Sequence, residues 1–490
     1  MKKMMMKGAM KGEPKGLRST PPLDSHAQYE GTALLADPVH EYITFTVPTS
    51  HDPHEVTEKD LIDSPWLQRL RYIYQLQSAR WVYPSAEHSR FQHSLGAMYV
   101  AQRFARHLYP SLKETLGDIP SPAYVEELLR VTALFHDVGH GPFCHFFDDH
   151  FLDEYGATHE IIGQAIIKEK LGGLIKKLRR SPAEPFRSGE QLDPEHVAFL
   201  ILKDPHKDSS RYPSWLSFLQ PLLGGIYTAD NLDYVLRDSF MCGVAIGPVD
   251  LSRLIHYTFF TMKGLTLHKT GLSALQMFLN ARSYLYSNVY YHRTTRAIDL
   301  HLREIFRSTV KQIFPHHPLQ QLDRYLELTD WSLIEAVRTW KASRSREKRR
   351  LYGEWQKILQ RQLKWKKAYE TILPTSGIER GRIFMDEKAI ENGIRKALPS
   401  HFKKLEFRVD MANQDPRPLN PLSMGEFQIH VYDSSIQTVS KEDLTELFKF
   451  IPAKIAQCRI FVRSHEHDRL LAEIANKVLG AERASSKTNL

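Results

Sequence analysis

The sequence predicts a mainly α-helical protein that carries a smaller α+β lobe near its C-terminus. Two stretches, residues 97–108 and 125–136, repeat their apolar side chains at the three- and four-residue spacing of amphipathic helices. From about residue 403 onward, short runs typical of strands alternate with runs typical of helices. The strand candidates are Leu405–Met411, Gly425–Tyr432 and Ala456–Val462, and the helix candidates are Lys441–Phe450 and Glu466–Leu479.

The composition indicates a soluble globular protein. Hydrophobic residues make up 42% of the 490 residues and charged residues 25%. No run of eighteen apolar residues occurs, so we expect no membrane span. Three widely spaced cysteines, Cys144, Cys242 and Cys458, favour a reducing compartment, and we expect a cytoplasmic location. The formal charge of +9 suits anionic ligands such as nucleotides or nucleic acid, although many proteins carry such a charge without using it.

Changes in composition predict four sections of the chain. Residues 1–30 are basic and lack apolar periodicity, which predicts a mobile tail without a secretory signal. A catalytic core is expected over 31–340, a basic helical segment over 341–402 and the α+β lobe over 403–490.

Two local elements are predicted near the start of the core. Alternating side chains over residues 42–47 predict a short strand. Ser64 and Pro65 are a typical cap and first turn of a helix, which we expect to run to about Gln75.

The stretch Ala133–His145 combines three histidines and an aspartate with a helix-breaking Gly-x-Gly-Pro. His136 continues the apolar face of the preceding helix, so its ring should point inward. A buried imidazole beside Asp137 needs a compensating partner, and a bound cation is one arrangement that supplies it. The alternative is a core histidine that is hydrogen-bonded to its neighbour.

Two further segments place polar side chains on helix faces. His93 precedes Ala97 by four residues and continues its apolar stripe, which puts a second histidine on an inward face. Much later, Asp230, Tyr234 and Asp238 share one face of a predicted helix. Two carboxylates and a tyrosine make a poor core stripe but a plausible wall of a site.

These residues resemble one branch of the HD-domain phosphohydrolases, the deoxynucleoside triphosphate triphosphohydrolases, including vertebrate members that carry a sterile alpha motif. The resemblance rests on the segments Arg90–Gly96, His136–His145, Thr158–Glu160 and Asp230–Tyr234. It implies an HD-domain helical core that hydrolyses a dNTP to deoxynucleoside and triphosphate.

The resemblance also implies one divalent metal per site, which would be Mn, Fe, Ni, Zn or Mg. Two imidazoles and two carboxylates suit such an ion. A metal-bound water or hydroxide would then attack the α-phosphate. The implied ligands are His93, His136, Asp137 and Asp230.

Four further residues are implied in catalysis. His145 would protonate the departing 5′ oxygen, since histidine titrates near neutrality. Asp148 and His159 would assist it, and His140 would lie against the phosphates. The alternative for His145 and His159 is that they are surface or helix-cap histidines.

The resemblance carries a set of residues into the nucleotide pocket. The planar guanidinium groups of such a set suit phosphates, and its tyrosines suit stacking on the sugar, although the same tyrosines could be packing aromatics of a long helix. The chain departs from the pattern at Asn231, where a lysine is expected, and at Gln77–Arg80, which replaces a glycine-rich segment. The implied pocket residues are Gln75, Leu76, Arg90, Tyr234, Asp238, Arg282, Tyr290 and His292.

Regulation and partners are also implied. Asp63, Gln68 and Arg71 match positions that hold a nucleotide activator in the resembling enzymes, and a homo-oligomer, dimer or tetramer, is expected. The basic residues between 343 and 367 could bind nucleic acid or form a solvated helix face. Two other functions stay open: another HD phosphohydrolase activity, such as a nucleotidase or phosphodiesterase, and nucleic-acid binding with a weak active site.

Overall fold

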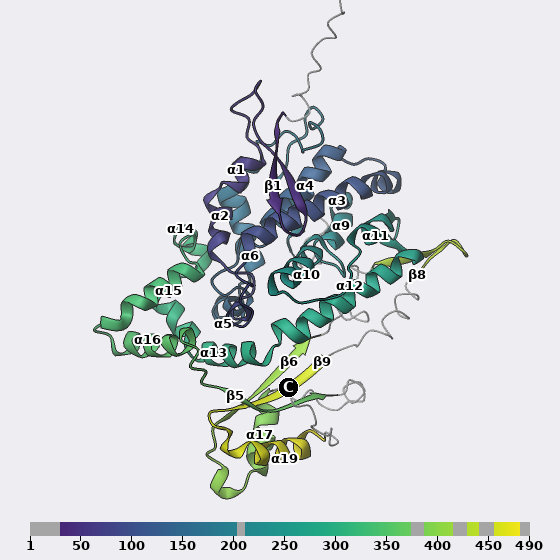
Figure 1. Ribbon diagram of the computed structural model, residues 1–490. Helices are drawn as coiled ribbons and strands as arrows, with labels where there is room; N and C mark the ends of the chain where they lie inside the picture. The colour runs from purple at the N-terminus through teal and green to yellow at the C-terminus, as the bar shows by residue number, and fades with distance from the viewer. Residues whose placement is uncertain (1–29, 203–210, 374–386, 415–428, 441–454, 481–490) are drawn as a thin grey trace, which may run out of the picture.

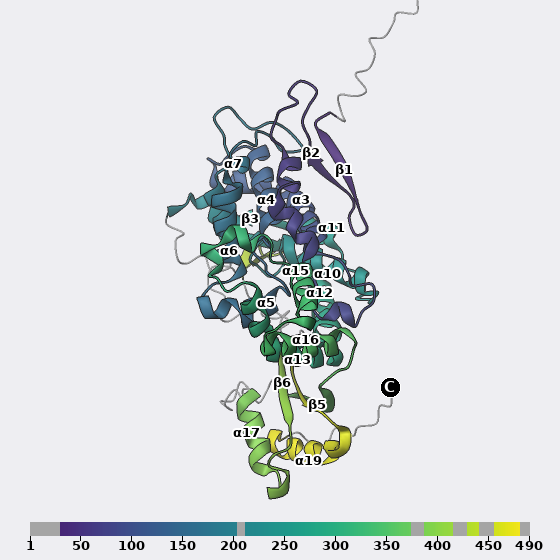
Figure 2. The same ribbon diagram turned by 90° about the vertical axis from the view of Figure 1, so that its left-hand side faces the viewer.

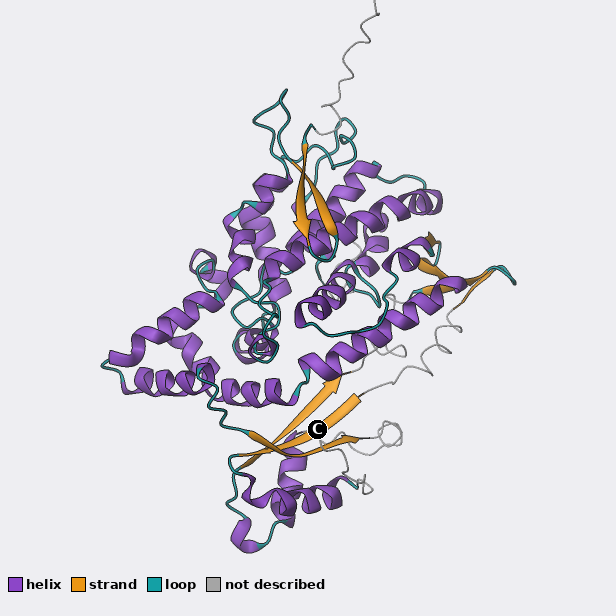
Figure 3. Ribbon diagram, viewed as in Figure 1, coloured by secondary structure: helices purple, strands orange, loops and turns teal. Residues whose placement is uncertain are grey.

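A computed structural model describes residues 30–202, 211–373, 387–414, 429–440 and 455–480. Most of these residues form a helical body, and a small lobe of strands and helices lies at one end of it (Figures 1 and 2). The chain is mainly helical with small sheets, which confirms the predicted fold class (Figure 3). No helix among the described residues is long and apolar enough to cross a membrane.

Two antiparallel neighbours, α3 (Arg90–Leu116) and α4 (Pro122–Phe135), form the centre of the body. Both predicted apolar stripes lie on these helices and are buried in the main core. Local signals set their ends: Ser89 and Gln92 form a capping box before α3, and Ser121 caps α4 ahead of a proline. Other helices of the body are α1 (Glu58–Ile62), α5 (His145–His150), α6 (His159–Ile166), α7 (Gly172–Ile175), α8 (Pro194–Leu200), α9 (Ser214–Leu219), α10 (Ala229–Cys242), α11 (Leu251–His256), α12 (Leu272–Leu285), α13 (Arg293–Ile313), α14 (Leu322–Tyr325), α15 (Asp330–Thr339) and α16 (Arg346–Leu359).

The N-terminal hairpin lies at the end of the body opposite the C-terminal lobe (Figures 1 and 2). It pairs β1 (Thr32–Asp37) with β2 (Glu41–Thr46) in antiparallel fashion. The strand predicted over residues 42–47 is confirmed as β2, whereas β1 was not predicted.

The helix predicted from Ser64 to about Gln75 is shorter than expected. Ser64 caps α2 (Pro65–Gln68) as predicted, by accepting a hydrogen bond from the backbone of Leu67, and a 3₁₀ turn follows over 69–72. The backbone N–H of Gln75 donates to His88 O at 3.0 Å, and that of Tyr74 donates to the carboxylate of Asp330 at 2.8 Å. These tertiary hydrogen bonds replace those that a continued helix would form.

The C-terminal lobe is built on a three-stranded sheet of order β5–β9–β6. Helices α17 (Glu387–Ala397) and α19 (Asp468–Leu479) bury their apolar faces against it. Trp365 and Phe461 pack instead against Ala297 and Leu300 of α13, which lies between the lobe and the body (Figure 1). The strands are β5 (Lys366–Leu373), β9 (Ile455–Val462) and β6 (Phe407–Gln414), all antiparallel to their neighbours.

Part of the predicted lobe belongs elsewhere. Strand β7 (His430–Asp433), from the candidate Gly425–Tyr432, pairs in parallel with β4 (Gly264–His268) at the edge of the body. Its sheet has the order β3–β4–β7–β8, with β3 (Thr258–Thr261) and β8 (Thr438–Ser440). The other two strand candidates are confirmed as β6 and β9, and the last helix candidate as α19. The helix candidate Lys441–Phe450 and the predicted tail lie outside the described residues, apart from residue 30.

The basic segment is not helical throughout, because Lys366–Leu373 forms strand β5. Its one long helix before that strand is α16, which buries Leu351, Trp355 and Ile358 in the main core. Its charged residues face outward, and some of them form ion pairs with acidic residues of the same helix, such as Arg350 with Glu347. Nucleic-acid binding by this face stays a prediction.

Glu127 on α4 offers a test of the packing. It is fully buried, and neither of its carboxylate oxygens finds a hydrogen-bond partner among the described residues. The nearest cation, Arg130, lies 3.9 Å away and donates instead to Glu58 at 2.6 and 2.9 Å. Burial, followed by the negative charge of Glu58, raises the pKa of Glu127 well above its usual value.

We therefore expect Glu127→Gln to stabilise the protein at neutral and alkaline pH. A carboxyl whose folded pKa is raised destabilises the fold as pH rises above its unfolded pKa, so the gain should vanish near pH 4 and grow with pH. It amounts to about 1.4 kcal/mol for each unit between the two pKa values. Thermal unfolding from pH 4 to pH 8 measures it. Glu126→Gln is the control. Because Glu126 forms an ion pair with Arg106, the Glu126→Gln protein should be less stable than wild type. A Glu127→Gln protein that is less stable than wild type at pH 8 would contradict the expectation.

Candidate metal centre and adjoining pocket

Three predicted metal ligands converge from three helices. His93 lies in the first turn of α3, His136 at the end of α4 and Asp230 in the first turn of α10. The two Nε2 atoms are 3.2 Å apart, and Asp230 Oδ1 lies 3.0 Å from that of His93 and 3.6 Å from that of His136. Helices distant in sequence thus bring two imidazoles and a carboxylate to one point.

The hydrogen bonds of the two rings fit a cation at this point. His136 Nδ1 donates to the backbone carbonyl of Ala133 at 2.6 Å, and His93 Nδ1 faces Asp233 Oδ2 at 2.7 Å. With both Nδ1 atoms protonated, both Nε2 lone pairs point at each other and at Asp230, an arrangement that a divalent cation makes favourable. Burial opposes charge on His93, but Asp230 and Asp233 outweigh it and raise the pKa of His93 to about 10, so the site attracts positive charge.

Asp137, the fourth predicted ligand, lies at the edge of this group. Its carboxylate is 3.7 Å from Nε2 of His93 and 3.4 Å from Nε2 of His136. It forms a buried ion pair with Arg90 and lies 3.3 Å from His140. Arg90 was expected to hold phosphates, and its guanidinium also donates to Cys144 Sγ at 2.8 Å. The resting partner of Arg90 is therefore Asp137, although its side chain still borders the pocket described below.

Asp233 is a functional residue that the sequence reasoning missed. It is fully buried and receives contacts from His93, from His40 Nε2 at 2.7 Å and from Arg237 Nε at 2.9 Å. These contacts fix the ring of His93 and hold its Nε2 toward the site. The carboxylate fits only because residue 96 is glycine: a Cβ there would lie 1.9 Å from Asp233 Oδ1. The pair of aspartates three residues apart, Asp230 and Asp233, was the available signal.

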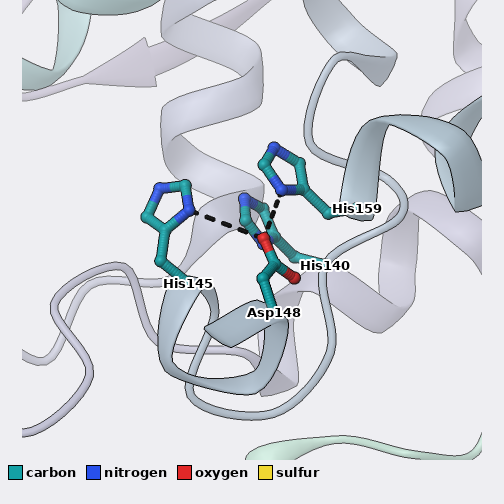
Figure 4. A group of neighbouring side chains, drawn as sticks. All are labelled: His140, His145, Asp148 and His159. Atoms are coloured by element: carbon teal, nitrogen blue, oxygen red, sulfur yellow. Dashed lines mark hydrogen bonds and ion pairs between the residues drawn. The ribbon is translucent and has the colours of Figure 1, made fainter. Parts of the chain in front are cut away.

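A second cluster joins the four residues predicted for catalysis (Figure 4). Asp148 lies between two rings, with its Oδ2 2.5 Å from His159 Nδ1 and 3.6 Å from His145 Nδ1. The rings of His140 and His159 stack with centroids 3.7 Å apart. Gly139 permits this approach, because a Cβ there would lie 2.0 Å from the backbone oxygen of His159. Ligand atoms of the four residues also lie within 4.8 Å of one another, as a second cation would require.

His145 and Asp148 have environments suited to proton transfer. The side chain of His145 is 57% exposed, and its exposed part faces the pocket. Partial burial there, together with His159 and Arg90, lowers the pKa of His145 despite its contact with Asp148. The contact with His145 and the hydrogen bond to His159 outweigh the effect of burial and hold the pKa of Asp148 well below its usual range. Asp148 therefore stays ionised and orients both imidazoles.

Two cavities adjoin at these clusters. The smaller, of about 80 Å³, is bordered by His159, Glu160 and three members of the candidate metal cluster, namely His136, Asp137 and Asp230. The larger, of about 560 Å³, extends toward α13 and toward the π-helical turn Tyr286–Tyr290 that follows α12. Four residues border both cavities: Gln75, Arg90, His145 and Tyr234.

Most of the predicted pocket residues border the larger cavity. Gln75, Leu76, Arg90, Tyr234, Asp238 and Tyr290 all do. Asp238 accepts from Tyr290 at 2.5 Å and contacts His88 Nε2 at 2.8 Å, so His88 is another residue that the sequence reasoning missed. Gln75 Oε1 is buried without a hydrogen-bond partner among the described residues.

Two predicted pocket residues lie further from the larger cavity and do not border it. Arg282 is 9% exposed and lies close to Tyr286, with Nε and Nη1 lacking hydrogen-bond partners in the described part of the chain. Such a buried cation favours an anion nearby. His292 caps α13 by accepting from the backbone of Thr294, and its ring contacts Tyr83. His292 thus has a structural role in this arrangement.

The two departures from the resembling pattern have structural consequences. Asn231 completes the capping box of α10, with its side chain accepting from the backbone of Thr228 at 2.7 Å. It is buried and borders neither cavity. Gln77 adopts a left-handed backbone, with φ of 47°, and borders the larger cavity with Ser78 and Ala79. The second departure therefore shapes the pocket directly.

The three residues predicted to bind an activator lie near one another: Asp63 directly follows α1, Gln68 ends α2, and Arg71 lies in the 3₁₀ turn after α2. Asp63 is ion-paired with Lys59 at 2.7 Å, Gln68 donates to the carbonyl of Ile62, and Arg71 donates to Gln68. None of them borders either cavity. An activating role for them stays a prediction.

Two family profiles match parts of this chain. The family profile described as "HD domain" matches residues 90–198, and the profile "HD associated region" matches residues 249–390. The chain therefore carries an HD domain followed by an HD-associated region.

Several known proteins are similar to this chain. The uncharacterized protein MJ1154 of Methanocaldococcus jannaschii is 32% identical over 260 residues, which are 52% of this chain and 46% of that protein. The deoxynucleoside triphosphate triphosphohydrolase SAMHD1 of Bos taurus is 29% identical over 300 residues, 56% of this chain and 47% of the bovine protein. The chain thus matches about half the length of each of these relatives. A crystal structure of a hypothetical protein from Aquifex aeolicus has a TM-score of 0.64 at 24% identity, covering 91% of this chain and all of that one, which shows a shared fold.

Proposed function

We propose that this protein is a metal-dependent phosphohydrolase that converts a dNTP and water to deoxynucleoside and triphosphate. One observation carries the proposal: a cavity bordered by the metal cluster adjoins a larger cavity, and His145 borders both. A substrate with phosphates in the first and a nucleoside in the second would place its connecting oxygen beside His145. The larger volume, about 560 Å³, falls in the range of small-molecule sites. The similarity to bovine SAMHD1 supports the same substrate class.

Each group has a distinct task in this reaction. A divalent cation held by His93, His136, Asp230 and the nearby Asp137 would supply Lewis-acid polarisation of a phosphate oxygen. A water molecule adds through its oxygen to the α-phosphorus and loses one proton to the solvent, while the bond from that phosphorus to the 5′ oxygen breaks. His145 gives its proton to the 5′ oxygen, which leaves as the hydroxyl of the deoxynucleoside.

The sugar side of the pocket supports a deoxyribose. Asp238 holds the hydroxyl of Tyr290 at 2.5 Å, which fixes that ring at the wall of the larger cavity. In the proposal this ring occupies the space that a 2′ hydroxyl needs. The unpartnered Oε1 of Gln75, at the junction of the two cavities, can accept a hydrogen bond from the 3′ hydroxyl.

A second candidate is a nucleotidase that acts on deoxynucleoside monophosphates. The smaller cavity measures only about 80 Å³, and its wall includes the carboxylate of Glu160, which repels phosphate. A single phosphate fits these dimensions more easily than three. The metal cluster and His145 would serve both reactions, so the inorganic product separates them.

Product analysis with each dNTP and each deoxynucleoside monophosphate, in Mn²⁺ and in Mg²⁺, tests the proposal. Wild type should release triphosphate and deoxynucleoside from at least one dNTP, alone or in a mixture that also tests activation. His136→Ala should lower the release of both products by about a thousandfold or more, and His145→Ala by about 10²- to 10⁴-fold. Orthophosphate from monophosphates without any triphosphate from dNTPs would replace the proposal with the second candidate.

A further inference from the structure

Three polar residues of α13 line the larger cavity and do not border the smaller one. Thr295, Arg296 and Asp299 all border the cavity. Residues 295 and 299 share one face of the helix, because they are four positions apart. Thr295 is 3% exposed, and its hydroxyl has no hydrogen-bond partner among the described residues. An unpaired hydroxyl in a buried wall is costly unless a ligand completes it.

The charged pair in this wall, Arg296 and Asp299, is held in place by Asp410 and Ser78. Arg296 forms a bidentate pair with Asp410 of β6, with its Nη2 2.5 Å from Oδ1 and its Nε 3.1 Å from both carboxylate oxygens. Asp410 is fully buried, so this pair anchors the guanidinium to the C-terminal sheet. The remaining nitrogen, Nη1, lies 3.7 Å from Asp299 Oδ2, and the hydroxyl of Ser78 donates to Asp299 Oδ1. A donor and an acceptor are thereby fixed side by side.

We propose that Arg296 and Asp299 form hydrogen bonds with the base of the substrate and select guanine. This inference rests on the proposed function, because it places the nucleoside in the larger cavity. The guanidinium can only donate hydrogen bonds, and an ionised carboxylate can only accept them. Guanine is the base that places an acceptor, O6, beside two neighbouring donors, N1–H and the N2 amino group. Adenine and cytosine each offer one donor group beside a ring nitrogen, and thymine offers one N–H between two carbonyls. Each of these bases therefore forms fewer hydrogen bonds with Arg296 and Asp299 than guanine does.

A purely structural role for the pair predicts a different result. If Asp299 only holds Ser78 and Arg296 in place, its loss should weaken the binding of all four nucleosides equally. If it contacts the base, its loss should weaken one of them selectively. Selectivity among bases is therefore the readout that separates the two roles.

The test measures binding of deoxyguanosine, deoxyadenosine, deoxycytidine and thymidine to the full-length protein by calorimetry. These probes lack phosphates, so they report on the larger cavity alone. Wild type should bind deoxyguanosine about tenfold more tightly than the other three, as expected for one good pairing. Asp299→Asn should remove that preference and leave the other three affinities within about twofold. Asp149→Asn is the matched control, because Asp149 borders the same cavity, is exposed and should not affect the preference.

The outcomes separate this inference from the proposed function. Equal binding of all four nucleosides by wild type, or no binding of any, overturns the inference even if Asp299→Asn does not fold. Release of triphosphate from all four dNTPs at equal kcat/KM also overturns it and leaves the proposed function intact. Selective deoxyguanosine binding without triphosphate release would support the inference and overturn the proposed reaction.

Discussion

Replacement of His136 by alanine is expected to abolish binding of a divalent cation and to lower hydrolysis by about a thousandfold or more. His136 Nε2 is one of two imidazole nitrogens that face Asp230, and its Nδ1 is already committed to the carbonyl of Ala133. His93, Asp230 and the nearby Asp137 would remain, but none of them supplies the second imidazole nitrogen at this point. Loss of a Lewis acid removes several kcal/mol of transition-state stabilisation, and each 1.36 kcal/mol is tenfold in rate.

Metal content and turnover of the purified variants should change together in a graded way. Asp233→Asn keeps all ligands but weakens the contact that orients His93, so cation affinity should fall by about 10- to 100-fold. His301→Ala is the control. His301 is 1% exposed, pairs with Glu354 at 2.7 Å and lies on α13, outside the candidate metal cluster. It should lose stability but retain the metal. A His136→Ala protein with full metal content and normal turnover would show that the cluster is not the metal centre.

The central helices could be predicted from the sequence because their signals are local. The apolar stripes of α3 and α4 lie on single helices, and Ser64 marks the start of α2 by its own chemistry. What ended α2 early was a contact that no local pattern reveals, namely the hydrogen bond from Tyr74 to Asp330, 256 residues away. Strand β7 was assigned to the wrong sheet for the same reason, since its partner β4 lies far earlier in the chain.

In the candidate site, too, some residues could be predicted from the sequence, whereas others depend on contacts between distant segments. The candidate ligands His93, His136 and Asp230 could be proposed from inward helix faces and a family resemblance, and these three side chains do converge. Asp233 and His88 were missed, because each contributes by holding a residue from a distant segment. Asp233 positions His93 across 140 residues, and His88 contacts Asp238 across 150. A resemblance indicates which residues face a substrate, whereas the supporting contacts depend on the fold of this chain.

The role of Arg90 also depends on three-dimensional context. An arginine beside a predicted metal centre suggests a phosphate contact, but here the guanidinium is ion-paired with Asp137 and bonded to Cys144. Arg90 therefore has to exchange one anion for another if a phosphate is to bind there. Such an exchange would release Asp137 toward the candidate ligands His93 and His136, only 3.7 and 3.4 Å away. Substrate and metal binding at this site should consequently support each other.

Replacement of His145 by alanine is expected to lower dNTP hydrolysis by about 10²- to 10⁴-fold while the metal content stays unchanged. The departing 5′ oxygen is strongly basic and needs a proton, which in the proposal comes from His145. If the leaving group is 4-nitrophenolate, which leaves without protonation, most of this loss should disappear. The comparison of a dNTP with a 4-nitrophenyl phosphate ester therefore distinguishes loss of an acid from loss of the fold.

The pH dependence gives an independent test of the same role. A general acid acts in its protonated form, so kcat/KM of wild type should fall as pH rises through the pKa of His145 in the free enzyme. Burial in the pocket, with His159 and Arg90 nearby, lowers that pKa, which places the fall below pH 6.5. A bound polyanion raises the pKa, so the fall of kcat should lie at higher pH. His145→Ala should lack both falls. His150→Ala, one turn later on α5 and bordering neither cavity, should retain them. An unchanged pH profile in His145→Ala would assign the proton to another group.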